Sequence, residues 1–213
     1  MLNLLIITAV KAEADAIGLL ENAHIVAAGV GRTNAAAATT EMLVQHRHRR
    51  PFDAVISAGI AGALPGSELS IGDALLASTC IYVEEGIITG RGFANMAGLG
   101  FPLGDFEGNA VPVDEQMLDA LGATFRIGPI ATVATCSGTN AAAEEVVRRT
   151  GALAEAMEGA AVVHAARRLR VPAIELRAIS NTTGDRADQQ WDLQAGFASL
   201  GDAIRRAVEI LAR

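Results

Sequence analysis

The segment MEGAAVVHAARRLRVPAIELRAISNTTGDR (residues 157–186) decides the fold class of this chain. Its pattern predicts the end of a strand, then a helix, then a second strand that ends near Asn181. The first junction places a carboxylate, Glu158, at the start of the helix, and the second strand ends on the neutral amide of Asn181. In a chain that is 51% hydrophobic, a polar group at each strand end needs a structural or a functional explanation.

The same alternation of strands and helices extends outward from this segment. It indicates an α/β fold in which a mixed central sheet is flanked by helices on both faces. We expect a single domain over residues 1–213, with ligands beyond the carboxyl ends of the strands. The Gly-rich residues 86–112 have no clear period, and we interpret them as a long loop. Strands are predicted at 3–10, 23–29, 52–59, 127–135, 152–157 and 172–181, an extended segment at 72–86, and helices at 11–20, 31–48, 114–121, 139–151, 158–170 and, with an amphipathic period, 197–211.

Composition excludes several classes of protein. With 51% hydrophobic and 19% charged residues, the chain is globular rather than disordered. A net charge of −7 argues against broad nucleic-acid binding. Two cysteines are too few for a disulfide framework, and we expect reduced thiols. The apolar run 4–10 predicts a buried strand rather than a signal peptide, and no stretch approaches the roughly 18 apolar residues of a membrane span. We therefore expect a cytoplasmic protein.

Two glycine motifs and four histidines have ordinary structural interpretations. GVGRTN (29–34) lacks the third glycine of a dinucleotide fingerprint and predicts a tight turn from strand to helix. AGIAG (58–62) predicts a second glycine turn, after a buried strand, where the backbone closely approaches another group. The histidines show no metal-ligand spacing, so we expect neither a metal site nor a cofactor.

Three polar residues at predicted strand ends also have non-catalytic interpretations. Glu158 could be a helix-start carboxylate stabilised by the helix dipole. Glu13, in the KAE that follows the first strand, could be an exposed residue of the first helical turn. Asn181, followed by TTGD, could begin a turn. No single one of these residues decides between structure and function.

In combination, the motifs resemble the purine-type nucleoside phosphorylase/nucleosidase superfamily over nearly the whole chain. The resemblance rests on a first strand ending in Ala-Val-x-x-Glu, on GVGRTNAAAAT, on DAVISAGIAGAL followed by IGDALLAS, on EAMEGAAVVHAA and on LRAISN. Within the superfamily, AEAMEGAA and ISNTTGDRADQQWDL are similar to the futalosine hydrolases, a family of nucleosidases in menaquinone biosynthesis. The resemblance implies a nucleoside phosphorylase-like fold.

The resemblance also implies the roles of the polar residues in cleaving a ribosyl C–N bond. That reaction builds oxocarbenium character on the sugar and negative charge on the purine. Glu158 would hold the ribose, with Met157 packed against it, and Glu13 would deprotonate the attacking water. A donor at the purine would stabilise the leaving group. Adenine-specific members place an aspartate where this chain has Asn181.

Asn181 predicts a 6-oxopurine as the leaving base. A carboxylate facing O6 would bring two acceptors together, which costs about 1–3 kcal/mol or more. An amide NH₂ can instead donate to N7 or O6. This favours hypoxanthine, the base of futalosine, over adenine.

The rest of the substrate would be a carboxylated aromatic ketone. Arg91, Phe93, Leu99 and Phe101, in a region that often crosses a subunit interface in this family, are candidates to bind it, and we expect a homo-oligomer. Cys136 occupies the position at which the family usually has an aromatic residue that stacks on the purine. The sequence therefore does not identify which residue stacks on the purine in this chain. The remaining substrate-binding candidates are Ile60, Thr135, Cys136, Ser137, Arg186 and Trp191.

Three alternatives remain open at this point. A phosphorylase would need arginines near the first strand–helix junction; TAVKAEAD has none, although Lys11 and Arg32 lie near enough to be considered. An adenine-type nucleosidase, acting on methylthioadenosine, S-adenosylhomocysteine or aminodeoxyfutalosine, is opposed by Asn181. A non-catalytic nucleotide-binding module is opposed by the presence of both Glu13 and Glu158.

Overall fold

Strands β1 (Leu4–Thr8) and β3 (Ala54–Ala63) lie side by side and in parallel in the middle of the sheet. The computed structural model describes residues 2–213. Every residue of β1 is buried, and Ile60 is the one residue of β3 that is partly exposed. Strands can be apolar throughout only when both faces of the sheet are covered, which is the case here.

The sheet is mixed, as predicted, and it closes on itself. Strand β10 pairs in parallel with β3 and antiparallel with β4, so that β3, β10, β4, β8 and β9 form a ring of neighbours. β1 and then β2 extend the sheet outward from β3. The strands not yet bounded are β2 (Ala23–Ala27), β4 (Ala74–Tyr82), β8 (Arg126–Thr132), β9 (Ala154–Ala156) and β10 (Ala173–Thr182).

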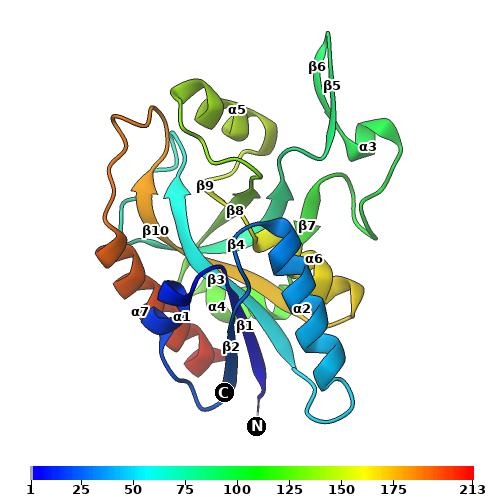
Figure 1. Cartoon of the computed structure of the whole chain (residues 1–213), viewed down its shortest axis with the longest axis vertical. Helices are drawn as coiled ribbons and strands as arrows, with labels where there is room; N and C mark the ends of the chain where they lie inside the picture. Colours follow the sequence, from blue (N-terminus) through cyan, green and yellow to red (C-terminus); the bar gives the residue numbers. More distant parts are fainter. Residues whose placement is uncertain (1) are drawn as a thin grey trace.

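Helices cover both sides of this sheet (Figure 1). α7 packs on β10, with α1 and α4 beside it, and α6 packs against β3 and against α2, which lies on β1. α6 can lie close to the sheet because it is rich in small residues, and a Cβ at Gly159 would overlap the carboxyl group of Glu175. The helices are α1 (Lys11–Ile17), α2 (Arg32–His46), α4 (Glu115–Gly122), α5 (Asn140–Thr150), α6 (Gly159–Arg168) and α7 (Leu193–Leu211).

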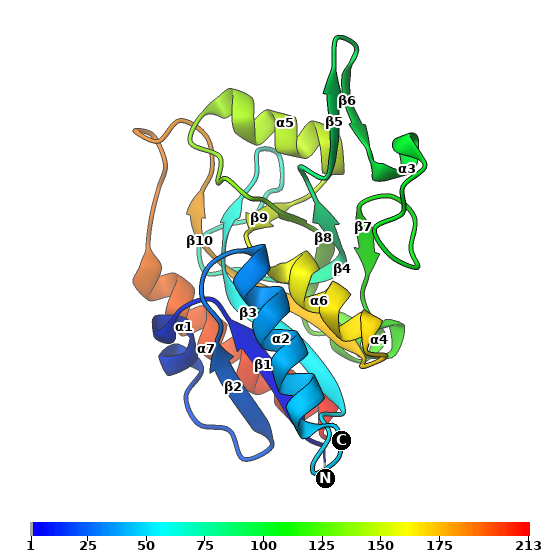
Figure 2. The same cartoon turned by 45° about the vertical axis from the view of Figure 1, so that its right-hand side comes forward.

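The prediction of a loop over residues 86–112 is wrong. β5 (Gly86–Thr89) and β6 (Gly92–Asn95) form a hairpin, α3 (Met96–Leu99) follows, and β7 (Ala110–Pro112) pairs with β4. Elements of three or four residues are too short to show a period in the sequence. The hairpin projects away from the rest of the chain (Figures 1 and 2).

The prediction of a glycine turn at 58–62 is also wrong, because β3 continues through it to Ala63. The two glycines make room for side chains rather than for a turn. A Cβ at Gly59 would lie 2.6 Å from Glu13 Oε1, and a Cβ at Gly62 would lie 3.0 Å from Asn181 Nδ2. By contrast, GVGRTN is the predicted turn, with positive φ at Gly29 and Gly31. No helix among residues 2–213 combines the length and the apolarity that crossing a membrane requires.

Candidate active site

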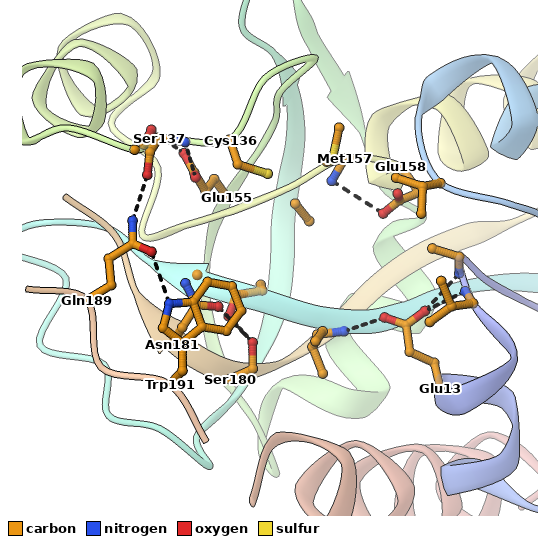
Figure 3. Close-up of a pocket in the computed structure, with 18 of the residues that line it drawn as sticks. Glu13, Cys136, Ser137, Glu155, Met157, Glu158, Ser180, Asn181, Gln189 and Trp191 are labelled. Atoms are coloured by element: carbon orange, nitrogen blue, oxygen red, sulfur yellow. Dashed lines mark hydrogen bonds between the residues drawn. The ribbon is translucent and has the colours of Figure 1, made fainter. Parts of the chain in front are cut away.

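A cavity of about 430 Å³ opens at the carboxyl ends of β1, β2, β3 and β10. This is the edge at which ligands bind in open α/β sheets. Figure 3 shows Glu13, Met157 and Glu158 toward one end of the cavity and Ser180, Asn181, Gln189 and Trp191 toward the other. Glu13, Glu158 and Asn181, which the sequence analysis singled out, therefore line one cavity.

Glu13 is held by backbone donors from two strands. Its Oε2 accepts hydrogen bonds from the N–H groups of Ala9 (2.8 Å) and Val10 (3.1 Å), and its Oε1 accepts one from Ile60 N–H (2.9 Å). The side chain is buried, at 3% exposure, so the interpretation as an exposed first-turn residue is wrong. An ionised carboxylate has about four lone-pair positions, so three hydrogen bonds leave one position open on Oε1.

Glu158 is anchored from outside its own helix. It is the N-cap residue of α6 but makes no side-chain capping bond. Its Oε1 accepts a hydrogen bond from Gly31 N–H (2.9 Å), and its Oε2 lies 3.4 Å from Arg177 Nη2. The turn that GVGRTN forms is thus part of this site, since its backbone positions the carboxylate.

Arg177 is a residue of the site region that the sequence analysis missed. It is 1% exposed, and it forms ion pairs with Glu175 (2.7 Å) and Glu158. Burial opposes its charge, yet Glu175, Glu158 and Glu13 together raise the pKa of Arg177 above its usual value. A signal was present: two charged residues spaced by two in a buried strand point to the same face. Arg177 offsets the negative charge of the carboxylates at this end of the cavity.

Asn181 presents its amide toward the opposite end of the cavity. Its Nδ2 donates to the carbonyl of Thr182 (2.9 Å), and its Oδ1 accepts from Ser180 Oγ (2.8 Å). Because a carbonyl can only accept, the Thr182 contact fixes the NH₂ group on that side. One N–H of Asn181 therefore remains for a ligand. Asn181 belongs to β10 and does not begin a turn.

The loop 183–192 completes the Asn181 end. Arg186 lies over the indole of Trp191, with Cζ 4.7 Å from the ring centroid. Gln189 links the loop to the rest of the site: its Nε2 donates to the carbonyl of Ser137 (2.9 Å), and its Oε1 accepts from Trp191 Nε1 (3.0 Å). Arg186, Gln189 and Trp191 all line the cavity; the sequence analysis had missed Gln189.

Glu155 is a carboxyl group in the cavity wall that the sequence analysis also missed. It is 5% exposed and accepts hydrogen bonds from Ser137 N–H (2.7 Å) and Ser137 Oγ (2.6 Å). Burial raises its pKa, against the effect of the Ser137 donors. Burial, followed by Glu155 and Glu158, also raises the pKa of the Cys136 thiol. Cys136 therefore stays protonated at neutral pH and is a poor nucleophile.

The other predicted substrate-binding residues fall into two groups. Ile60, Cys136, Ser137, Met157, Arg186 and Trp191 line the cavity, whereas Thr135 is exposed beside it and Phe93 is not part of its wall. Phe93 instead lies under the guanidinium of Arg149, 4.2 Å from ring centroid to Cζ, in a separate groove. Phe93, Arg91, Leu99 and Phe101 belong to the projecting hairpin and the segment after it, so a role at this cavity stays a prediction.

Two cations considered as phosphate ligands are engaged elsewhere. Arg32 forms ion pairs with Glu84 (3.3 Å) and Glu85. Lys11 pairs with Asp15 on the exposed face of α1. Within residues 2–213 there is also no cluster of three or more metal-ligating side chains.

Comparison with known proteins places this geometry in a family. The model of the phosphorylase superfamily matches residues 16–213. A futalosine hydrolase of Streptomyces coelicolor is 35% identical, covering 99% of this chain and 97% of the relative. A futalosine hydrolase of Acidothermus cellulolyticus is 39% identical, with 93% and 90% covered.

Solved structures share the fold. A 5'-methylthioadenosine/S-adenosylhomocysteine nucleosidase of Helicobacter pylori superimposes with a TM-score of 0.78 at 18% identity, covering 98% of each chain. A futalosine hydrolase of the same organism superimposes with a TM-score of 0.76 at 19% identity, covering 98% of this chain and 97% of the other. The match of the family model and the identity to the curated relatives lead to one conclusion: this chain belongs to the phosphorylase superfamily and, within it, to the futalosine hydrolase family.

Proposed function

We propose that this chain hydrolyses the N-ribosyl bond of futalosine, releasing hypoxanthine and dehypoxanthine futalosine in menaquinone biosynthesis. The observation that supports this most strongly is the convergence of Glu13, Glu158 and Asn181 on one cavity. The relatives at 35% and 39% identity are named futalosine hydrolases, and each is covered over at least 90% of its length.

At the end of the cavity that holds the sugar, Glu158 binds the ribose and Glu13 activates the water. Glu158 accepts from a ribose hydroxyl and stabilises the positive charge that builds as the C–N bond breaks. Glu13 takes a proton from the attacking water through the open position on Oε1. Two backbone hydrogen bonds to Oε2 and one to Oε1 fix the carboxylate, and a general base placed in this way accelerates the reaction about 10²–10⁴-fold.

At the base end, Asn181 stabilises the departing purine. The free N–H of its amide donates to N7 or O6 as negative charge develops on the base. Ser180 Oγ donates to its carbonyl oxygen, which holds the amide in the orientation suited to a 6-oxopurine. Adenine would present an amino donor in place of O6, so this donor would lose its acceptor there.

The charge of this cavity favours water over phosphate as the attacking group. Glu13, Glu155 and Glu158 line it, while Arg32 is neutralised by Glu84 and Glu85. Two like unit charges 4 Å apart repel by roughly 4 kcal/mol at an effective dielectric constant of about 20. A phosphate dianion beside Glu13 and Glu158 would meet like charge that the single guanidinium of Arg177 offsets only in part, whereas neutral water would not.

The same proposal includes a homo-oligomer in the cytoplasm. The projecting hairpin exposes Ile87 (44%) and Ile88 (77%), and Phe101 beyond it is 66% exposed. A second copy of the chain would cover these side chains. Light scattering should give a mass above 22.0 kDa, and Ile88→Asp should lower it; a monomeric wild-type protein would contradict this part of the proposal.

A direct assay tests the substrate. The protein is incubated with futalosine, inosine and 5'-methylthioadenosine in separate reactions, and the free bases are separated by chromatography. We expect hypoxanthine from futalosine at the highest rate. Release of adenine at a higher rate would favour an adenine-type nucleosidase, and binding without turnover of any of the three would favour a nucleotide-binding module.

A further inference from the structure

We infer that Trp191 forms the stacking face of the purine site. This inference rests on the proposed function, because it assigns the part of the cavity that would hold the leaving base. Cys136, which lines the cavity where an aromatic partner was expected, cannot stack on a ring. Within residues 2–213, Trp191 is the one aromatic side chain in the cavity wall.

The backbone places Trp191 directly beside Asn181. The two residues form an antiparallel bridge, flanked by hydrogen bonds from Thr182 N–H to Gln190 O (3.0 Å) and from Asp192 N–H to Ser180 O (2.9 Å). Residues directly opposite each other in an antiparallel pair project their side chains to the same side. The indole therefore stands next to the amide that would contact the edge of the base.

The indole is held at its N–H edge and is about half exposed where it lines the cavity. Gln189 accepts its Nε1–H, and Arg186 covers part of the ring. Trp191 is nevertheless 47% exposed, a large open area for the one aromatic group of a binding cavity. A purine that places its N7 and O6 edge at Asn181 can lay its face on this open area, as in offset stacking.

The two neighbours would then contribute in different ways. Every purine has an aromatic face, so stacking on Trp191 contributes affinity without distinguishing hypoxanthine from adenine. The hydrogen bond from Asn181 distinguishes the two bases. Loss of the indole should therefore weaken binding of both bases by a similar factor.

The test uses the fact that Trp191 is the single tryptophan of the chain. Hypoxanthine and adenine are each titrated into the wild-type protein, and tryptophan emission is recorded beside calorimetric binding. We expect hypoxanthine to change the emission with the same midpoint as the calorimetric titration. Calorimetric binding without any change in Trp191 emission would overturn the inference.

Two variants separate stacking from loop structure. Trp191→Phe and Trp191→Leu both lose the N–H that bonds Gln189, but only Phe keeps a flat ring. Removing base–aromatic stacking raises a dissociation constant about 5- to 150-fold, and we expect this for hypoxanthine with Trp191→Leu, whereas Trp191→Phe should stay within about 5-fold of wild type. Equal losses in the two variants would assign Trp191 a purely structural role.

The outcome is separable from that of the proposed function. Base binding that depends on the ring in a protein that leaves futalosine intact would overturn the proposed function and leave the stacking inference standing. Futalosine hydrolysis by the wild type together with unchanged hypoxanthine binding in Trp191→Leu would support the proposed function and overturn the stacking inference.

Discussion

The two ends of the cavity are built in different ways. At the end proposed to hold the sugar, Glu13 and Glu158 are 3% and 5% exposed, and backbone N–H groups together with the buried Arg177 hold them. At the end proposed to hold the base, Trp191 is 47% exposed on the loop 183–192, which a hydrogen bond to Ser137 and a bridge to Asn181 join to the rest of the fold. The two carboxylates thus belong to the buried core of the fold, whereas Trp191 lies on a loop at its surface.

This difference predicts how the ends respond to substitution. Groups fixed by the sheet can be preorganised for charge that develops in the transition state, so changes there should lower kcat. At the other end, changes at Asn181 of β10 should alter which base is bound, and changes at Trp191 of the loop should alter how tightly it is bound.

Glu13→Gln should have the largest effect. The amide can no longer take a proton from water, so kcat should fall about 10²–10⁴-fold. Its NH₂ group would also face backbone N–H donors, at a cost of about 1–3 kcal/mol in unfolding free energy. Steady-state kinetics with futalosine and thermal unfolding measure the two effects. Asp15→Asn, on the exposed face of α1, is the matched control; wild-type activity in Glu13→Gln would remove Glu13 from the mechanism.

Gly59→Ala should also lower kcat, although it removes no polar group. The added Cβ would lie 2.6 Å from Glu13 Oε1 and would also meet the guanidinium of Arg177, so the carboxylate of Glu13 must move. Misplacing a catalytic group by about 1 Å can cost about 10²-fold in rate. Gly90→Ala, where no atom lies within 4 Å of the new Cβ, controls for the loss of a glycine. Equal kinetics in the two variants would mean that the position of Glu13 is not critical.

Asn181→Asp should change base preference rather than remove activity. A carboxyl group can share a proton with N7 and accept from the amino group of adenine, but it opposes O6 of hypoxanthine. The ratio of kcat/KM for futalosine to that for 5'-methylthioadenosine should fall about 5- to 150-fold, the equivalent of about 1–3 kcal/mol. A parallel loss on both substrates would show that Asn181 does not select the base.

Glu155→Gln should have the smallest effect, and one that depends on pH. Because burial raises the pKa of Glu155 in the folded state, the stabilising protonated form is fully present below about pH 4.5 and is lost as the pH rises through the raised value. The melting temperature of Glu155→Gln minus that of the wild type should therefore increase as the pH rises from 4.5 to 8.

Glu145 provides a control of opposite sign. Hydrogen bonds from Arg148 and Arg149 lower the pKa of this exposed group to about 2, so its contribution is present above about pH 4.5 and lost as the pH falls toward 2. The melting temperature of Glu145→Gln should be lower than that of the wild type at neutral pH and equal to it near pH 2. The same pH trend in both variants would rule out burial as the cause at Glu155.

The parts of the molecule that sequence could predict are those with local signals. The buried runs of β1 and β10, the helix that follows Glu158 and the capped helix 140–150 each show a period or a cap within a few residues. The mixed α/β fold followed from them, and the family followed from the resemblance of the sequence motifs; the structure and the comparisons confirm both.

The parts that sequence missed depend on long-range contacts. Whether Glu13 is exposed depends on the approach of β3, which the first helical turn does not encode. Gly59 and Gly62 suggested a turn because the side chains that need the space come from α1 and β10. Arg177 looked like part of an ordinary strand until the sheet placed it beside Glu158, and Trp191 gained its neighbour only through the bridge to Asn181.

The central claim is that water, activated at the buried sugar end, displaces the base. It is tested most directly by measuring hypoxanthine release from futalosine in phosphate-free buffer and again with added inorganic phosphate. The account predicts the same rate in both, with dehypoxanthine futalosine as the sugar product. Release that requires phosphate, with a ribosyl 1-phosphate as product, would contradict it.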